Sequence, residues 1–412
     1  MRVSLLTLGC KVNQAEMADI EGALQGMGHE IVGLTENPDV CVVNTCTVTA
    51  KSDYQSRQLI RRAGRRGARV IVSGCYAELN RGAVTAMEGV ETVVSNLDKA
   101  SIINILDGNS ESIGSPMPGG RSRYFLKVQD GCNNSCSYCI VPRARGSSKS
   151  VPPHEIIEKA RRAVSEGYRE LVLTGIHLGQ YGADLEGGSL PGLVENILNN
   201  TGVQRLRLSS IEVNEVDDRL LGLFEDPRVA RHLHIPLQSG DDGVLSMMNR
   251  RYGTAFFREV ATRIAERLPE AALGTDVIAG FPGESESAFI NTVDLIRELP
   301  FSYLHVFPYS RRPGTPAADM DDAVGESLRK ERSRTLRSLG ARKKESYMAR
   351  QVGRTLETLI ESRTSEGTWR GTSCNYLKVR VSGRALKRGS IVPVRVQGLL
   401  EGELAGKHIE TT

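Results

Sequence analysis

The sequence predicts an α/β protein in three parts: an N-terminal domain built on a parallel sheet, a central partial barrel of six βα units, and a small all-β barrel at the C-terminus. Apolar segments of strand length alternate with segments of helical periodicity through most of the chain. A stretch rich in glycine, serine and proline interrupts this alternation after the first hundred residues. Beyond residue 350 the helical segments stop, and short strand-like segments follow one another.

Three apolar strands in the first domain, residues 1–110, each run into a cysteine. They are Val3–Leu8 with Cys10, Val40–Val43 with Cys46, and Val70–Ser73 with Cys75. The turns that follow parallel strands lie at one edge of the sheet, so we expect the three thiols to meet and share a ligand. Three unrelated buried cysteines are the alternative. Cys41 falls inside the second strand and is expected to pack in the core.

A linker and a longer alternation of strands and helices come next. Residues 108–122 hold four Gly, four Ser and two Pro, the composition of a flexible linker. The strands of the central domain, residues 118–348, are Tyr124–Gln129, Glu170–Thr174, Val203–Leu208, His232–Pro236, Leu273–Ala279 and Tyr303–Phe307. Six units are too few for a closed eight-stranded barrel, so we expect a partial one with its site at the carboxyl ends of the strands.

The most specific feature of this domain is a loop with three cysteines. Cys132, Cys136 and Cys139 follow the first central strand with the spacing C-x3-C-x2-C. Three thiolates on a four-iron cluster leave one iron open to a reactant. A zinc site would commonly show a fourth Cys or His nearby, yet the next candidates are His154 and Cys374. A disulfide is poorly suited to three thiols on one short loop.

The last part, residues 350–412, has strand-like segments at Leu356–Glu361, Tyr376–Val381 and Ile391–Val396. It carries ten Lys or Arg against six acids after Val352. Small barrels of this kind often hold single-stranded nucleic acid, but they also serve as plain structural modules. We assign no role to Cys374, which lies in a turn of this part.

The distribution of charge and of apolar residues indicates what kind of partner this protein binds and where it is located. Lys51–Arg69 has seven Lys or Arg and one Asp, and Leu328–Gln351 has nine Lys or Arg and two Glu. Each is typical of a solvated helix face, but two such faces favour a polyanionic partner. No apolar run approaches the roughly 20 residues of a membrane span, and the N-terminus lacks the features of a signal peptide. We therefore expect no membrane partner and a cytoplasmic protein whose reduced cysteines bind metal.

Seven motifs run in order along nearly the whole chain. They are TLGCKVNQAE (7–16), NTCTVT (44–49), SGCYA (73–77), DGCNNSCSYCIVPRARG (130–146), HIPLQSGDDGVLSMMNRRY (234–252), GTDVIAGFPGE (274–284) and GTSCNYLKV (371–379). Together they resemble the radical S-adenosylmethionine methylthiotransferases. The Lys-Val-Asn after Cys10 and the Ile-Val-Pro-Arg-Ala-Arg after Cys139 favour the subgroup that acts on threonylcarbamoyladenosine in tRNA. Its close relatives act on isopentenyl-adenosine in tRNA or on an aspartate of a ribosomal protein.

The resemblance implies a radical SAM core, a TRAM-like RNA-binding barrel, and the addition of a methylthio group to C2 of N6-threonylcarbamoyladenosine beside the anticodon. The implied cofactors are S-adenosyl-L-methionine and two 4Fe-4S clusters. Their ligands would be Cys132, Cys136 and Cys139 for one cluster, and Cys10, Cys46 and Cys75 for the other. The implied partners are a tRNA anticodon loop, a flavodoxin- or ferredoxin-like electron donor, and a sulfur donor.

Five residues around the first cluster are candidates for contacts to the bound cofactor. Gly175, Gln238, Ser239 and Glu284 follow strands of the core, although Glu284 is equally suited to cap the helix from Ser285. Tyr138 is suited to pack against the adenine or against the core. A zinc-stabilised RNA-binding protein without catalysis is the alternative from another class.

Overall fold

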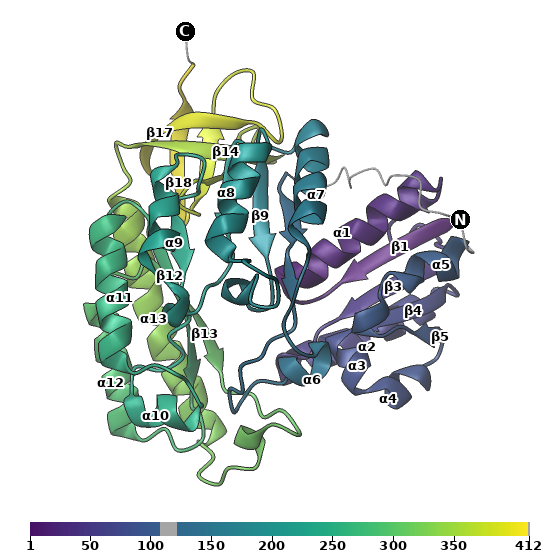
Figure 1. Cartoon of the computed structure of the whole chain (residues 1–412), viewed down its shortest axis with the longest axis horizontal. Coiled ribbons are helices and arrows are strands. Elements are labelled where there is room, and N and C mark those ends of the chain that lie inside the picture. The colour runs from purple at the N-terminus through teal and green to yellow at the C-terminus, as the bar shows by residue number, and fades with distance from the viewer. Residues whose placement is uncertain (108–121, 411–412) are drawn as a thin grey trace.

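The computed structural model describes residues 1–107 and 122–410, so the predicted linker at 108–122 lies outside the described residues except for Ser122. Figure 1 shows the N-terminal sheet on one side of the molecule, the central sheets and their helices on the other, and the C-terminal strands at one end. The predicted α/β class, with its three kinds of substructure in the predicted order, is confirmed. None of the helices described is both long enough and apolar enough to cross a bilayer.

The N-terminal sheet has five parallel strands in the order β2-β1-β3-β4-β5. The strands are β1 (Arg2–Thr7), β2 (Glu30–Ile31), β3 (Val40–Thr45), β4 (Arg69–Gly74) and β5 (Val90–Val93). The helices are α1 (Lys11–Gly26), α2 (Ala50–Gly64), α3 (Cys75–Leu79), α4 (Arg81–Thr85) and α5 (Ser101–Asp107). All of β3 is buried, which explains its unbroken apolar run. Thr49 and Ser52 form a capping box that begins α2.

The six central strands form two parallel sheets of three, in the orders β6-β9-β10 and β11-β12-β13. They are β6 (Tyr124–Lys127), β9 (Glu170–Thr174), β10 (Arg205–Leu208), β11 (His232–His234), β12 (Ala272–Ala279) and β13 (Tyr303–Pro308). The first predicted strand is shorter than expected, because β7 (Gln129–Asp130) pairs antiparallel with β8 (Lys149–Ser150) instead of continuing β6. Leu206 of β10 forms an isolated parallel bridge with Val229, which lies before β11, and the two sheets remain separate.

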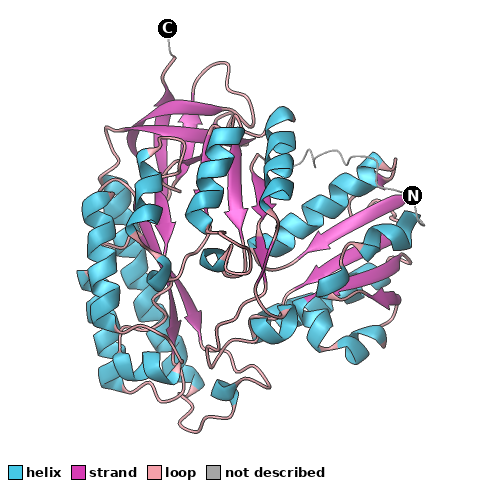
Figure 2. Ribbon diagram, in the orientation of Figure 1, coloured by secondary structure: helices cyan, strands magenta, loops and turns pink. Residues whose placement is uncertain are grey.

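Most helices of this domain cover one side of these strands, and the other side faces the N-terminal domain (Figure 2). The helices are α6 (Val141–Arg145), α7 (Pro153–Ser165), α8 (Leu190–Asn200), α9 (Asp218–Gly222), α10 (Asp242–Met247), α11 (Thr254–Arg267), α12 (Glu286–Glu298) and α13 (Glu326–Ala349). Of these, α6 lies instead beside α3 of the N-terminal domain (Figure 1). Single turns of 3-10 helix lie at Asn96–Asp98, Leu178–Gln180, Val213–Glu215, Leu223–Glu225 and Pro316–Ala318. Leu171, Ile235 and Phe257 are fully buried between strands and helices, and each such side chain stabilises the fold by about 1.5–3 kcal/mol.

The C-terminal strands close into a barrel in the order β14-β15-β16-β18-β17. They are β14 (Thr355–Arg363), β15 (Trp369–Ser373), β16 (Lys378–Ser382), β17 (Ile391–Leu400) and β18 (Glu403–His408). The prediction named three of these strands and missed β15 and β18. Each of the two has a glycine in its interior, where side chains at Gly371 and Gly406 would collide with neighbouring strands. The glycines that permit this close packing also remove the apolar signal of a strand.

Candidate metal centres and their shared cavity

The three cysteines of the N-terminal domain lie at the carboxyl edge of its sheet. β3 and β4 are in register up to the pair Thr45–Gly74, so the two strands end at one level. Cys46 and Cys75 follow these strands directly, and Cys10 is the N-cap of α1. The thiol of Cys46 lies within electrostatic reach of both Cys10 and Cys75. The structure thus brings together the three thiols that the sequence predicted to meet.

Two glycines allow the thiol-bearing loops to approach this closely. Gly9 has a φ of +105°, and a Cβ atom there would lie 3.0 Å from the Sγ atom of Cys46. Gly74 has a φ of +100°, and a Cβ atom there would lie 2.3 Å from the backbone nitrogen of Thr45. L-residues with side chains rarely adopt this backbone region, and neither site has space for a side chain.

A buried arginine joins this thiol group to the central domain. Arg145, at the end of α6, donates from Nε to the Sγ of Cys75 (3.3 Å) and from Nη2 to the Oδ1 of Asn13 (2.5 Å). Its Nη1 donates to Glu16 and to Asp130, both at 2.9 Å. Burial alone would lower the pKa of Arg145, but the Cys75 thiol and the two carboxylates raise it well above its ordinary value. The guanidinium therefore stays a cation beside Cys75.

The other three cysteines lie on one loop between β7 and α6. The Cys132 backbone N–H donates to the carbonyl of Gly146 (3.1 Å), and that of Cys139 donates to the carbonyl of Cys136 (3.0 Å). Arg250 donates from Nη1 to the Sγ of Cys136 (3.3 Å). As in the N-terminal domain, one thiol of this group accepts a hydrogen bond from a largely buried guanidinium.

A histidine also contacts this loop. The Nδ1 atom of His177 lies 3.4 Å from the Sγ of Cys132, and its Nε2 lies 2.6 Å from a carboxylate oxygen of Glu215. Burial would lower the pKa of His177, but the hydrogen bonds with Cys132 and Glu215 raise it to about 10. His177 is therefore a cation at neutral pH and lies beside the sulfur of Cys132.

The buried thiols need further positive charge to ionise. Burial raises the pKa of Cys10, Cys46 and Cys136, and it raises the pKa of Cys139 to about 12. Metal ions stabilise coordinated thiolates strongly enough to reverse such a shift. All of these cysteines are free of disulfides. The donor set of each group, three thiols beside N–H donors, fits an iron–sulfur cluster.

A cavity of about 390 Å³ lies between the two domains. The thiol-bearing residues Cys132, Cys136 and Cys139 line it from the central domain. Val48 and Thr49, two and three residues after Cys46, line it from the N-terminal domain. Cys10, Cys46 and Cys75 are not among the residues that line it. The cavity is therefore lined by one thiol group directly, and the N-terminal domain contributes residues that follow Cys46 in sequence.

The four candidates for cofactor contacts differ in their positions. Gln238 lines the cavity and has a φ of +67°, a backbone conformation that is uncommon for non-glycine residues. Gly175 lies outside the lining, where a Cβ atom would lie 2.8 Å from the side chain of Gln129. Of these two, Gln238 has the geometry expected of a ligand contact.

Ser239 and Glu284 are engaged within the protein. The Ser239 hydroxyl is fully buried and lies 3.3 Å from the hydroxyl of Thr292. Glu284 accepts from Arg332 (2.7 Å) and from the backbone N–H of Gly280 (2.8 Å). The cap of α12 is instead Ser285, which accepts from the N–H of Ala288. Their assignment as cofactor contacts stays a prediction.

Three other residues singled out from the sequence also have defined places. Tyr138 lines the cavity and packs edge-on against Phe281, with ring centroids 6.4 Å apart. Cys41 is fully buried in the core, as predicted, and burial raises its pKa to about 11. Cys374 lies in the turn after β15, where its carbonyl accepts from Arg207 (3.1 Å).

Sequence reasoning missed several residues of the site. It assigned no role to Arg145, His177 or Arg250, because each meets its cysteine only through the fold. The one available signal was that Arg145 and Arg250 lie inside the motifs quoted above. A group of His234, Asp276 and His305 was also missed, and Asp276 lines the cavity.

Two family models match the chain. The radical SAM superfamily matches residues 126–296, and the Uncharacterized protein family UPF0004 matches residues 2–95. The two matches cover the two thiol groups separately.

Curated relatives match nearly the full length. A threonylcarbamoyladenosine tRNA methylthiotransferase of Bacillus subtilis is 38% identical over 96% of this chain and 93% of its own length. One of Aquifex aeolicus is 36% identical over 87% of this chain and 93% of its own. A tRNA-2-methylthio-N(6)-dimethylallyladenosine synthase of Pelotomaculum thermopropionicum is 30% identical over 98% and 96%. These relatives confirm the resemblance that the motifs indicated.

A solved structure supports the fold. The radical S-adenosylmethionine methyltransferase of Kitasatospora setae, determined with tryptophan and an S-adenosylmethionine analogue, aligns with a TM-score of 0.59. The alignment covers 77% of this chain and 75% of that one at 15% identity. It therefore supports a shared fold and nothing further.

Proposed function

This chain belongs to the family of threonylcarbamoyladenosine tRNA methylthiotransferases, and we propose that it adds a methylthio group to C2 of N6-threonylcarbamoyladenosine beside the anticodon of tRNA. The observation that carries the proposal is the presence of two three-thiol groups, one of which lines a cavity between the two domains. Three cysteines of one loop form the first group, and the carboxyl edge of the N-terminal sheet assembles the second. An RNA-binding protein stabilised by zinc would not need two such groups.

The family uses S-adenosyl-L-methionine and 4Fe-4S clusters, and the two thiol groups fit a cluster each. We assign Cys132, Cys136 and Cys139 to one, and Cys10, Cys46 and Cys75 to the other. When bound, these groups supply the radical that takes hydrogen from C2 and the sulfur and methyl that replace it.

The chain's own residues hold and tune these groups. Arg250 and His177 hydrogen-bond to thiols of the first group, and Arg145 does so in the second. Such N–H···S bonds stabilise negative charge on the sulfur and raise the reduction potential of a cluster. Gln238 is our strongest candidate for a cofactor contact, with Gly175, Ser239 and Glu284 as further candidates.

The tRNA partner follows from the family, and we propose that the basic helix and the C-terminal barrel bind its phosphates. In α13 most cations lie exposed, among them Lys330, Arg334 and Lys344, while Arg332 is buried against Glu284. An adenine in an anticodon loop is unpaired and can leave the stack at modest cost. We further propose a cytoplasmic reaction that depends on a flavodoxin- or ferredoxin-like electron donor and on a separate sulfur donor.

Nucleoside mass spectrometry of tRNA from a deletion strain tests the substrate. We expect methylthio-threonylcarbamoyladenosine to disappear while its unmethylthiolated precursor accumulates. Loss of methylthio-isopentenyl-adenosine instead would identify isopentenyl-adenosine as the substrate. This is the second candidate, and the name of the 30% identical relative points to it. Unchanged methylthio-adenosine would remove the tRNA proposal and leave the ribosomal protein as the candidate substrate.

Iron analysis tests the cofactors independently. The reconstituted chain should hold about eight irons and cleave S-adenosylmethionine under reduction. A colourless, air-stable preparation that contains zinc would contradict both clusters.

A further inference from the structure

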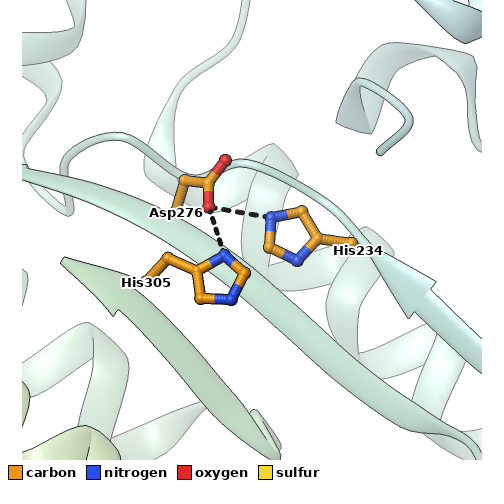
Figure 3. Close-up of side chains that lie close together, drawn as sticks. All are labelled: His234, Asp276 and His305. Carbon is orange, nitrogen blue, oxygen red and sulfur yellow. Dashed lines mark hydrogen bonds and ion pairs between the residues drawn. The ribbon is translucent and has the colours of Figure 1, made fainter. Parts of the chain in front are cut away.

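Three polar side chains from three neighbouring strands meet on the inner side of the central sheets (Figure 3). His234 of β11 lies with its Nε2 atom 2.9 Å from Oδ1 of Asp276 on β12. His305 of β13 lies with its Nδ1 atom 3.1 Å from the same oxygen. Both imidazoles therefore share one carboxylate oxygen. The other oxygen, Oδ2, makes no hydrogen bond to any residue in the described part of the chain.

A chain of hydrogen bonds orients this group. The Tyr303 hydroxyl lies 2.7 Å from Nε2 of His232 and 3.0 Å from Nδ1 of His234. In the neutral tautomer in which His234 donates from Nε2 to Asp276, its Nδ1 accepts from the Tyr303 hydroxyl, and the tyrosine oxygen is free to accept from Nε2 of His232. Asp276 is thus held by ordered donors, and two atoms remain available to a ligand: Oδ2 of Asp276 and Nε2 of His305.

This group lies next to the cavity that Cys132, Cys136 and Cys139 line. Asp276 lines it together with Gln238 and Phe307. His305 precedes Phe307 by two residues on β13, so both side chains lie on one face of the strand. The His305 side chain is 52% exposed, whereas that of His234 is 6% exposed. His305 is therefore accessible at the edge of the cavity.

We propose that Asp276 and His305 recognise the polar N6 substituent of the target adenine; this inference rests on the proposed function. A threonylcarbamoyl group offers ureido N–H donors and a threonine end with a hydroxyl and a carboxylate. Oδ2 of Asp276 accepts from a ureido N–H, and Nε2 of His305 meets the threonine end. An isopentenyl group consists only of carbon and hydrogen. It would displace water from both side chains and offer them no hydrogen bonds in return.

A divalent cation is the competing occupant, because two imidazoles and a carboxylate are common metal ligands. The hydrogen-bond chain argues against it. Nε2 of His234 and Nδ1 of His305 each donate a proton to Asp276, and a metal ion would have to displace these protons. The hydrogen bond with Tyr303 favours the tautomer in which His234 carries its proton on Nε2.

The test uses the reconstituted enzyme and two anticodon stem-loop RNAs that differ only in the N6 group, threonylcarbamoyl or isopentenyl. Both RNAs compete in one reaction, and mass spectrometry gives the ratio of methylthiolated products. We expect His305→Phe and Asp276→Asn each to reduce the wild-type preference for threonylcarbamoyl RNA by about 10- to 100-fold. The matched control is His154→Phe, which changes an exposed histidine on α7 and should keep the wild-type ratio.

The outcomes separate the inference from the proposed function. Iron content and circular dichroism establish that each variant is folded and loaded. Wild-type preference in both folded variants would overturn the inference and leave the proposed function intact. A divalent ion beyond the cluster iron that is lost in Asp276→Asn would also overturn it, in favour of a cation site. A wild-type enzyme that modifies only isopentenyl RNA would overturn the proposed function, and the inference with it.

Discussion

The two thiol groups of this protein are similar in composition but are built in opposite ways. Cys132, Cys136 and Cys139 share one loop and face the cavity directly. Cys10, Cys46 and Cys75 come from three segments and meet only because three parallel strands end at one level. The first group therefore depends on local chain geometry, whereas the second depends on the integrity of a sheet. Disturbing that sheet should affect one group and spare the other.

The largest expected effect comes from Gly74→Ala. Its Cβ atom would lie 2.3 Å from the backbone of Thr45, so the loops of Cys46 and Cys75 must separate. We expect iron to fall from about eight to about four per chain, with the cluster of the central domain retained. The control is Gly67→Ala, which has a similar positive φ of +74° but nothing within 4 Å. Equal loss of iron from both variants would show that backbone strain, not the collision, is responsible.

A smaller effect is expected at the contact that joins the two regions. Glu16 in the N-terminal domain pairs with Lys99 of its own domain and with Lys127 (2.8 Å) and Arg145 (2.9 Å) of the other. Burial favours the neutral form, but these cations hold the pKa of Glu16 well below its ordinary value. This ionised carboxylate therefore stabilises the fold at pH values above about 4.5, and that contribution is lost as the pH falls further.

Glu16→Gln tests this contribution. We expect the iron-free variant to be less stable than wild type by about 3 kcal/mol at pH 7, because three cations lose a buried partner. The difference should shrink below about pH 4.5, where Glu16 of the unfolded wild-type chain takes up a proton while the folded chain keeps the carboxylate ionised. Urea unfolding at pH 7 and pH 4 measures it, with the exposed Glu158→Gln as control. A difference that does not change with pH would contradict the role of the ionised carboxylate.

The smallest expected effect concerns the hydrogen bond that an arginine donates to each thiol group. Arg145→Lys and Arg250→Lys keep a positive charge but remove the guanidinium that donates to Cys75 or to Cys136. We expect each change to lower the reduction potential of its own cluster by roughly 50 mV, the value of about 1 kcal/mol for one electron. Redox titration followed by electron paramagnetic resonance resolves the two clusters.

Arg143→Met, an exposed position on the same short helix as Arg145, should leave both potentials unchanged. A change at Arg145 that moves both potentials together would mean that the two groups are electronically coupled.

Much of the fold could be predicted from the sequence. The bounds of β9 agree with the predicted Glu170–Thr174. This element has the apolar pattern of a buried strand, which local sequence determines. The strands β15 and β18 escaped prediction because cross-strand neighbours in the closed barrel define them. Exposure on one face and interior glycines leave little local signal.

The residues of the candidate site also differ in whether the sequence predicts them. The loop of Cys132 could be found from spacing alone. The contacts of Arg250 with Cys136 and of Arg145 with Cys75 span 114 and 70 residues, and no spacing rule reaches so far. The group around Asp276 comes from three strands whose side chains alternate between two faces, so its members are neither adjacent nor periodic.

Side-chain periodicity was enough to predict most strands. Because the cysteines lie within a few residues of these strands, their positions at the strand ends could also be predicted from the sequence. Only the tertiary structure decided what surrounds each thiol, which atoms of Asp276 and His305 remain free, and how the two domains enclose one cavity. Such relations depend on strand register and on the packing of distant segments. Hydrogen bonds and burial select them only once the whole chain has folded.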